Sequence, residues 1–353
     1  MGAASSVAAA DTYGSVDEAL AAGVAQADVD AYLAEAAGAW QPPSTREGAR
    51  TIQGEFKALE TKLAGGGTWD QDDEAQVRAL IERTRVYMRA CKDQGGANLR
   101  TLQLVRTQLE TIYAPSYLSM SEVIRKEDPA AWAAALALGQ RMESENLPNF
   151  WQSRTDLIPM YRDAVQAKGI FDGVMQGVGA ETGGDFTAAN VKHMFRALEK
   201  TTMKPDGHPM LDMANNVCDV IRGMLVYKRF GDMTRGIEAL RAHPDVVVMR
   251  TKDRYSTPTS GGWMDLVVNL KFLSDPNKHV CEIQFVHAKL LGVRKACGGH
   301  EAYNKFRSAL EMLEVHGALG AGGEQGGGGA MAAADPSAAI VAWLAQHGVK
   351  VKN

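Results

Sequence analysis

The chain has 353 residues and a formal net charge of −4, and 45% of its residues are hydrophobic. This length is enough for two domains, or for one domain with large helical additions. The slight acidity argues against a general nucleic-acid-binding protein, which usually carries a basic excess, although a local basic cleft is compatible with it.

Residues 1–16 form an Ala/Ser-rich leader that has two interpretations. It begins with the sequence MGAASS, which fits the N-myristoylation pattern with Gly2 as the acceptor. One acyl chain gives only weak, reversible membrane association. The alternative is a flexible leader that carries no modification.

The rest of the sequence favours a cytoplasmic protein. It has no run long and apolar enough to predict a transmembrane helix, and no signal-peptide pattern. Its cysteines, Cys91, Cys218, Cys281 and Cys297, lack the spacing of a zinc site, and two of them lie in apolar runs. We therefore expect a reducing compartment, with peripheral membrane association only if Gly2 is acylated.

Residues 17–182 are predicted to be an all-α region, because apolar residues recur there every three or four positions. The inner faces of its first three helices are Ile52, Phe56, Leu59 and Leu63; Val77, Leu80, Ile81 and Met88; and Leu102, Val105, Leu109 and Ile112. Asp70 is predicted to cap the second helix, and Asp128 with Pro129 to open a fourth. A fifth helix is predicted from Trp151 to Lys168, with a kink at Pro159.

Residues 183–316 are predicted to be a small mixed β-sheet domain flanked by helices, which makes the chain an α+β protein. The predicted strands are 217–227, 246–250, 264–272 and 279–286, and the predicted helices are 187–200, 232–242, 287–296 and 300–315. A helix between the first two strands favours parallel pairing of these strands. The short turn at 274–278 predicts that the last two form an antiparallel hairpin.

Two segments complete the predicted organisation. Residues 317–335 are rich in Gly and Ala and have no periodic pattern, so they are predicted to be a flexible linker. Residues 336–353 contain a short amphipathic helix that can dock on the body of the protein or on a partner.

Two carboxylates inside strand-like runs indicate a candidate site. Asp219 lies in the run from 217 to 227, and Glu282 lies in the middle of the run from 279 to 286. Alternation along a strand predicts that Glu282 and Gln284 share one face. A charge in a half-buried strand is costly unless it is paired or holds a metal. If the polar faces of the two strands meet, Asp219 and Glu282 can share one Mg²⁺ ion, whose remaining ligands come from substrate phosphates. The alternative for each residue is a structural ion pair.

Basic and aromatic residues between and before the two carboxylates favour a phosphate-containing substrate. The basic residues are Arg196, Lys200, Arg222, Lys252 and Arg254. Arginine offers a planar fork that matches phosphate, and lysine offers a point charge. The pair Gly261-Gly262 is expected to allow close backbone approach, and Trp263 to stack on a nucleobase.

The order of these pieces resembles the RelA/SpoT-like nucleotidyltransferase domain, the part that synthesises guanosine tetra- and pentaphosphate. The matching pieces are Asp219, Lys252-Asp253-Arg254-Tyr255, Gly261-Gly262-Trp263, Glu282-Ile283-Gln284 and Gly299-His300-Glu301-Ala302-Tyr303. The basic segment from Arg196 to Lys200 resembles the helix that precedes the first strand in this family. The resemblance covers residues 187–312.

This resemblance implies a Mg²⁺-dependent nucleotide pyrophosphokinase. Its partners would be ATP and a guanine nucleotide, or another nucleotide acceptor, whose 3′-hydroxyl receives pyrophosphate. Asp219 and Glu282 would hold Mg²⁺ and be catalytic. The nucleotides would be bound by Arg196, Lys200, Arg222, Lys252, Arg254, Trp263, Gln284, His300 and Tyr303.

Two alternatives stay open because the chain departs from the family pattern. Residues 264–267 replace a Ser and a His of the family, and Val286 replaces an arginine. A catalytically degenerate module that binds a nucleotide or a protein is one alternative. A nucleotidyltransferase that acts on another acceptor is the other.

Overall fold

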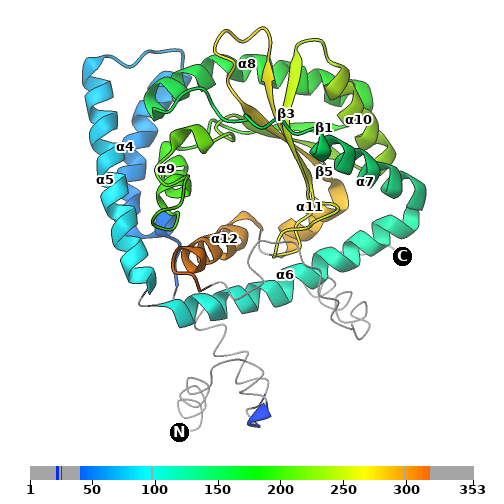
Figure 1. Ribbon diagram of the computed structural model, residues 1–353, viewed down its shortest axis with the longest axis horizontal. Helices are drawn as coiled ribbons and strands as arrows, with labels where there is room; N and C mark the ends of the chain where they lie inside the picture. Colours follow the sequence, from blue (N-terminus) through cyan, green and yellow to red (C-terminus); the bar gives the residue numbers. More distant parts are fainter. Residues whose placement is uncertain (1–20, 24, 26–39, 97, 298, 319–353) are drawn as a thin grey trace.

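The computed structural model describes residues 21–23, 25, 40–96, 98–297 and 299–318 (Figure 1). The leader with Gly2, most of the predicted linker and the predicted C-terminal helix lie outside these residues. Within the described part, no helix combines the length and the apolar character that crossing a membrane requires.

The first half of the described chain is helical, as predicted. After a short 3₁₀ turn, η1 (Pro43–Thr45), it contains α4 (Glu47–Ala64), α5 (Gln71–Gly96), α6 (Leu99–Glu127), α7 (Pro129–Ser144) and α8 (Leu157–Thr182). Two predicted caps are confirmed, because Asp70 Oδ1 accepts from the Asp73 amide and Asp128 Oδ1 accepts from the Ala131 amide. The predicted inner faces of α4 and α5 are buried, as are Leu102 and Val105 of α6. The side chains of Leu109 and Ile112 lie outside the described part.

The fifth helix differs from the prediction at both ends. It begins at Leu157, where Asp156 caps it, and it continues to Thr182. Pro159 therefore lies in the first turn, where a missing amide hydrogen breaks no intrahelical bond, so no kink is required. Gly183 ends the helix with φ of 79°, a conformation that glycine adopts without steric cost.

The second half forms a mixed sheet with strand order β1-β2-β5-β4-β3 in the described part of the chain. The strands are β1 (Asp185–Ala188), β2 (Arg222–Tyr227), β3 (Val246–Asp253), β4 (Leu266–Phe272) and β5 (Cys281–His287). The antiparallel hairpin of β4 and β5 is confirmed. The predicted parallel pairing of β2 with β3 is wrong, because β2 pairs in parallel with β5 and β3 lies at the far edge beside β4.

The helices of the second half are α9 (Met194–Thr202), α10 (Phe230–Ala242), α11 (Ala288–Ala296) and α12 (Gly299–Val315), with a short 3₁₀ turn at η2 (Ala214–Asn216). The helix predicted at 187–200 is displaced, because residues 185–188 form an edge strand and the helix begins at Met194. The strand predicted at 217–227 begins only at Arg222.

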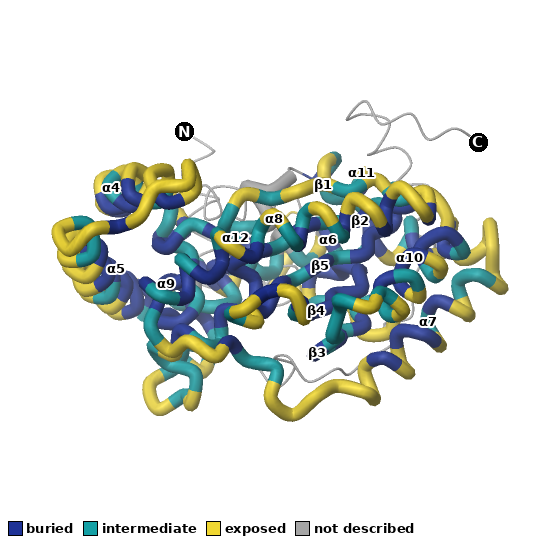
Figure 2. The backbone as a smooth tube through the Cα atoms, turned by 90° about the horizontal axis from the view of Figure 1, so that it is seen from above, coloured by how far each residue is buried: buried dark blue, intermediate teal, exposed yellow. Residues whose placement is uncertain are grey.

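The helical half surrounds the sheet instead of forming a separate bundle. Figure 1 shows α4 and α5 on one side, α6 below, α7 on the other side and α8 above the strands. In Figure 2 the buried backbone runs through the central strands and α9, while α4 and α5 carry long exposed stretches. The apolar core is accordingly shared by both halves, from Phe56 of α4 to Phe285 of β5.

Candidate functional site

One face of the sheet is polar across four strands. One row of residues in register across the sheet consists of Arg222, Glu282, Asn269 and Arg250. The next row on the same face consists of Met224, Gln284, Val267 and Lys252. Side chains of residues in register lie on the same side of a sheet. We define the polar face by Arg222, Glu282, Gln284, Asn269, Arg250 and Lys252. The strand alternation that was expected to place Glu282 and Gln284 on one face is confirmed.

The opposite face of the sheet belongs to the core. Leu225, Ile283, Phe285 and Val268 are fully buried there. Helix α10 contacts β2, β3 and β5, and α8 contacts β1 and β2. Because helices cover the core face, the polar face is the side of the sheet that can bind a ligand.

Asp219 lies in the turn before β2 and is held between two lysines. Lys192 Nζ lies 2.5 Å from its Oδ2, and Lys200 Nζ lies 3.0 Å from its Oδ1. Asp219 is only 8% exposed. Burial alone would raise the pKa of its carboxyl, but the two ammonium groups hold this pKa well below its usual range. Asp219 is therefore an anion whose charge is already compensated.

Glu282 is the second predicted carboxylate, and it lies near Asp219. Its amide donates to the Ile221 carbonyl at 2.9 Å, two residues after Asp219. Burial raises the pKa of Glu282, and the charge of Asp219 raises it further, whereas Lys200 and Arg254 lower it. Among the described residues, no side chain donates a hydrogen bond to this carboxylate, which leaves it available to a ligand.

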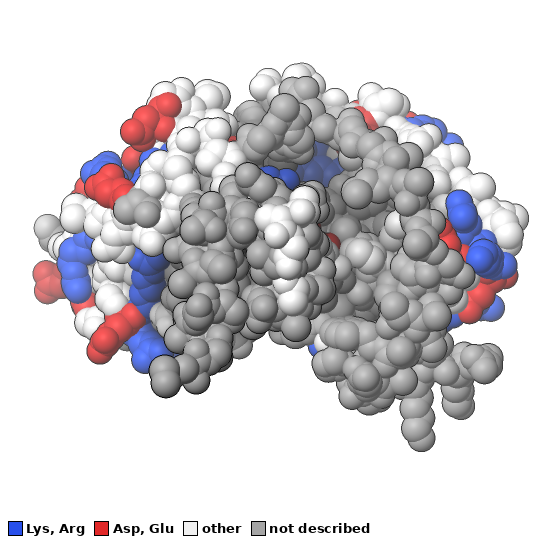
Figure 3. Space-filling model, turned by 90° about the horizontal axis from the view of Figure 1, so that it is seen from below, with Lys and Arg blue, Asp and Glu red and all other residues white. Residues whose placement is uncertain are grey.

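Three basic side chains of the polar face have no carboxylate within ion-pair distance among the described residues: Arg222, Arg250 and Lys252. Burial, together with the nearby charges of Arg250 and Arg254, lowers the pKa of Lys252 to about 8. Such like-charged, half-buried groups are stabilised by binding an anion. Figure 3 shows Lys and Arg atoms recessed near the middle of the face that it views.

Asp265 is a buried acid that the sequence analysis did not select. It is 0% exposed, and it accepts from Gln284 Nε2 at 3.0 Å and from Arg254 Nη1 at 3.2 Å. It therefore fixes two residues that were predicted to bind nucleotide. The same signal that selected Glu282, an acid within an apolar run, would have found it.

The remaining predicted residues lie apart from this cluster or outside the described side chains. Arg196 of α9 forms an ion pair with Glu199 and donates to Ser44 Oγ at 2.9 Å. His300 and Tyr303 belong to α12, and their side chains lie outside the described part.

Trp263 and the preceding glycines pack against helices. Trp263 is 3% exposed, with its ring edge-on to Tyr117 at 5.6 Å and the Arg294 guanidinium 5.0 Å from its centroid. Stacking on a base would require these neighbours to move. Gly262 has φ of 80°, and a Cβ there would lie 2.7 Å from Ala114 Cα. The close approach expected of the glycines is thus made to two helices, by Gly262 to α6 and by Gly261 to Phe306 of α12.

The loop between α7 and α8 brings two aromatic residues to the polar face. The Arg250 guanidinium lies 4.3 Å from the ring centroid of Phe150. The Phe150 ring lies 4.0 Å from that of Trp151, tilted by 39°. No sequence motif marked these residues, because they contact the sheet only through tertiary packing.

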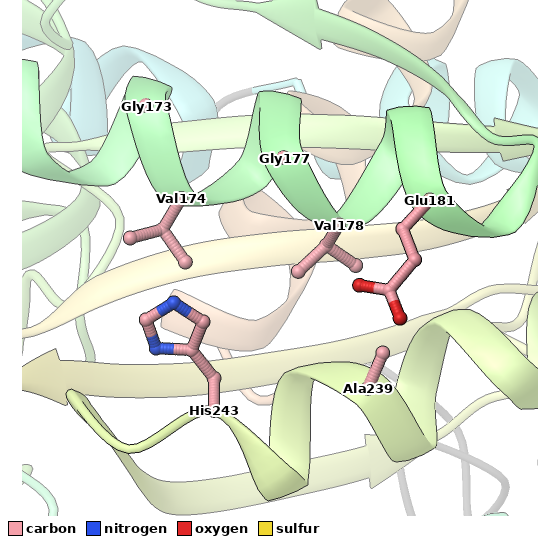
Figure 4. Close-up of a pocket in the computed structure, with 7 residues that line it drawn as sticks. All are labelled: Gly173, Val174, Gly177, Val178, Glu181, Ala239 and His243. Atoms are coloured by element: carbon pink, nitrogen blue, oxygen red, sulfur yellow. The ribbon is translucent and has the colours of Figure 1, made fainter.

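A separate pocket of 340 Å³ lies between α8 and α10, behind the core face (Figure 4). Gly173, Gly177 and Glu181 line it from α8, and Ala239 lines it from α10. It is therefore not part of the polar face.

The residues fit a magnesium ion only in part. In the described part of the chain, no three His, Cys, Asp or Glu side chains gather as metal ligands would. Glu282 offers carboxylate oxygens, which Mg²⁺ prefers, close to where substrate phosphates would neutralise the basic side chains. Asp219 can join it only if a lysine releases one of its oxygens. All four cysteines are buried free thiols and offer no ligands here.

A comparison with solved structures shows a structural likeness to known proteins. The chain is similar to a crystal structure of small alarmone synthetase 1 from Bacillus subtilis bound to its product pppGpp, with a TM-score of 0.31 and 17% identity. The alignment covers 45% of this chain and 91% of that chain. No protein-family model matches the sequence, and no curated protein matches it.

Proposed function

We propose that the polar face binds the polyphosphate of ATP and transfers pyrophosphate to the 3′-hydroxyl of a guanine nucleotide. The observation that carries this proposal is the position of Glu282, a carboxylate without a donor among the described residues, in register with Arg222 and Arg250. The motif order that resembles RelA/SpoT-like synthetases supports the choice of reaction.

The described residues supply charge and a base. Arg222 and Lys252 neutralise the phosphates, which is the main requirement of phosphoryl-type transfer. The acceptor oxygen forms a bond to the β-phosphorus of ATP, and the bond from that phosphorus to the oxygen bridging to the α-phosphate breaks, so that AMP leaves with the electron pair. Glu282 takes the hydroxyl proton, a role that its raised pKa favours.

A magnesium ion would be held by Glu282 together with the substrate phosphates, and it would neutralise charge on the transferred group. Asp219 would take part only after Lys192 or Lys200 releases it. In either case Asp219 keeps these two ammonium groups at the edge of the polar face.

The test is a transfer assay with labelled ATP, Mg²⁺ and either GDP or GTP. The Glu282→Gln variant should lose transfer by at least about a hundredfold, the range expected for a general base. The matched control is Glu238→Gln on the exposed side of α10, which should leave the rate unchanged. Absence of transfer by the unaltered protein to either nucleotide would refute the reaction.

A second candidate is a nucleotide-binding module without catalysis. The compensation of Asp219 by two lysines favours it, because a carboxylate engaged in this way is a poor metal ligand. This module would bind ATP with an affinity that falls when Arg222 is replaced by Met, yet it would transfer nothing.

A further inference from the structure

We infer that the base of the bound nucleotide stacks on an aromatic–guanidinium platform made by Arg250, Phe150 and Trp151. This inference rests on the proposed function, because the platform lies beside the proposed phosphate site. It assigns a ligand-binding role to the helical half of the chain, which supplies Phe150 and Trp151.

The platform is a stack of planar groups. The Arg250 guanidinium lies over the Phe150 ring at 4.3 Å, and the Trp151 ring follows at 4.0 Å from Phe150. All three residues are partly exposed. Aromatic rings and arginine planes are the groups on which proteins stack unpaired bases, and they accept any base that presents a π face.

The loop that carries the rings is fixed to the sheet at both ends. At its start, the Leu147 amide donates to the Met249 carbonyl at 3.0 Å, and the Asn146 side chain bonds to both backbone groups of Thr251. At its end, the Gln152 side chain bonds to both backbone groups of Val280. The platform is therefore positioned before any ligand arrives, which reduces the entropic cost of binding.

The platform also adjoins the charged centre of the site. The Phe150 carbonyl accepts a hydrogen bond from the thiol of Cys218, the residue before Asp219, at 3.5 Å. Arg250 is in register with Asn269, which is in register with Glu282. One nucleotide can therefore place its phosphates on Arg222 and Lys252 and its base on the platform.

Trp263 is less suited to this role, although sequence motifs favoured it. It is buried against Tyr117, and the Arg294 guanidinium lies 5.0 Å from its centroid. Phe150 and Trp151 are exposed enough to contact a base without rearrangement of α6 or α11.

The test compares ATP with inorganic tripolyphosphate, which has the phosphates but no base. Calorimetric titrations in Mg²⁺ buffer give the dissociation constant of each for the unaltered protein, Arg250→Lys and Phe150→Leu. Arg250→Lys keeps the charge and removes the planar group, and Phe150→Leu keeps an apolar side chain and removes the ring. Both should weaken ATP binding roughly tenfold and change tripolyphosphate binding by less than about threefold.

The matched control is Phe186→Leu, which makes the same change at a half-buried ring that packs on Phe171, on the core side of the sheet. It should leave both affinities unchanged. If Phe150→Leu does not fold, Arg250→Lys still decides the question. Equal affinity of the unaltered protein for ATP and tripolyphosphate, or equal loss of both in the variants, would overturn the platform alone. Failure to bind either ligand would overturn the phosphate site as well.

Discussion

Lys192 and Asp219 form an ion pair that is almost entirely removed from solvent: the two residues are 6% and 8% exposed, and Nζ lies 2.5 Å from Oδ2. Lys192 lies before α9 and Asp219 before β2, so the pair joins the helix to the sheet. Lys200 of α9 strengthens this junction through the other carboxylate oxygen, Oδ1.

Asp219→Asn should therefore destabilise the protein strongly. It leaves the Lys192 ammonium buried without its counterion, a change that typically costs about 3–5 kcal/mol. The free energy of unfolding in urea measures the effect.

The matched control for this change is Asp206→Asn, because Asp206 also pairs with a lysine, Lys92 at 3.1 Å, but its side chain is 95% exposed. This pair should contribute no more than about 1 kcal/mol. A loss of no more than about 1 kcal/mol in Asp219→Asn, the size expected for the control, would show that Lys192 does not depend on Asp219.

Binding of polyphosphate should weaken as the pH rises through the pKa of Lys252, about 8. Burial favours the neutral amine, so the cation that attracts phosphate is lost above this pH. The stability of the unliganded protein depends on pH in the opposite direction. Between about pH 8 and the usual lysine pKa, Lys252 binds more protons in the unfolded chain than in the folded protein. Its contribution to the free energy of unfolding therefore rises with pH. Tripolyphosphate titrations at pH 7 and pH 9.5 measure the binding effect.

Lys252→Arg is the control for this titration, because an arginine stays charged over the whole range. Its affinity for tripolyphosphate should fall less between the two pH values than that of the unaltered protein. Near pH 8, binding to the unaltered protein should also take up about half a proton, which titrations in buffers of different ionisation enthalpy detect. Identical pH profiles for the two proteins would show that Lys252 does not contact the phosphates.

Asp265→Asn should disturb both residues that Asp265 fixes. An asparagine can accept from only one of Gln284 and Arg254 and turns an NH₂ group towards the other, so we expect a loss of about 2–3 kcal/mol in unfolding free energy. A double-mutant cycle with Arg254→Met isolates the ionic part of this loss. A coupling energy below about 0.5 kcal/mol would mean that the two residues act independently.

The features of the site that could be predicted from the sequence are those that depend on residues close together in the chain. The strand period placed Glu282 and Gln284 on one face correctly, because alternation along a strand is a local property. The predicted pairing of β2 with β3 failed, because strand order depends on long-range packing that a connecting helix does not determine. Asp265 has the same sequence signal as Glu282, an acid in an apolar run, but it lies within residues 264–267, where the chain departs from the family pattern.

The aromatic platform illustrates what local patterns cannot predict. Phe150 and Trp151 lie in a loop of the helical half, where the sequence predicted only the start of a helix at Trp151, and about a hundred residues separate them from Arg250. Hydrogen bonds between that loop and β3, which are long-range contacts, help to bring them together. Similarly, the pattern at Gly262 predicted close approach of a backbone, but it could not identify α6 as the partner.

Gly262→Ala should show that this glycine serves the contact with α6. A Cβ at Gly262 would be unfavourable for two reasons. The backbone φ is 80°, and the Cβ would lie only 2.7 Å from Ala114 Cα. The matched control is Gly66→Ala, where φ is 85° and nothing lies within 4 Å, so that only the backbone cost of about 1 kcal/mol applies. Thermal unfolding of both variants should therefore show a larger loss for Gly262→Ala, since α6 must move to admit the methyl group. Equal losses of thermal stability in the two variants would mean that the loop can move to admit the methyl group while α6 stays in place. Gly262 would then be required only for its backbone conformation.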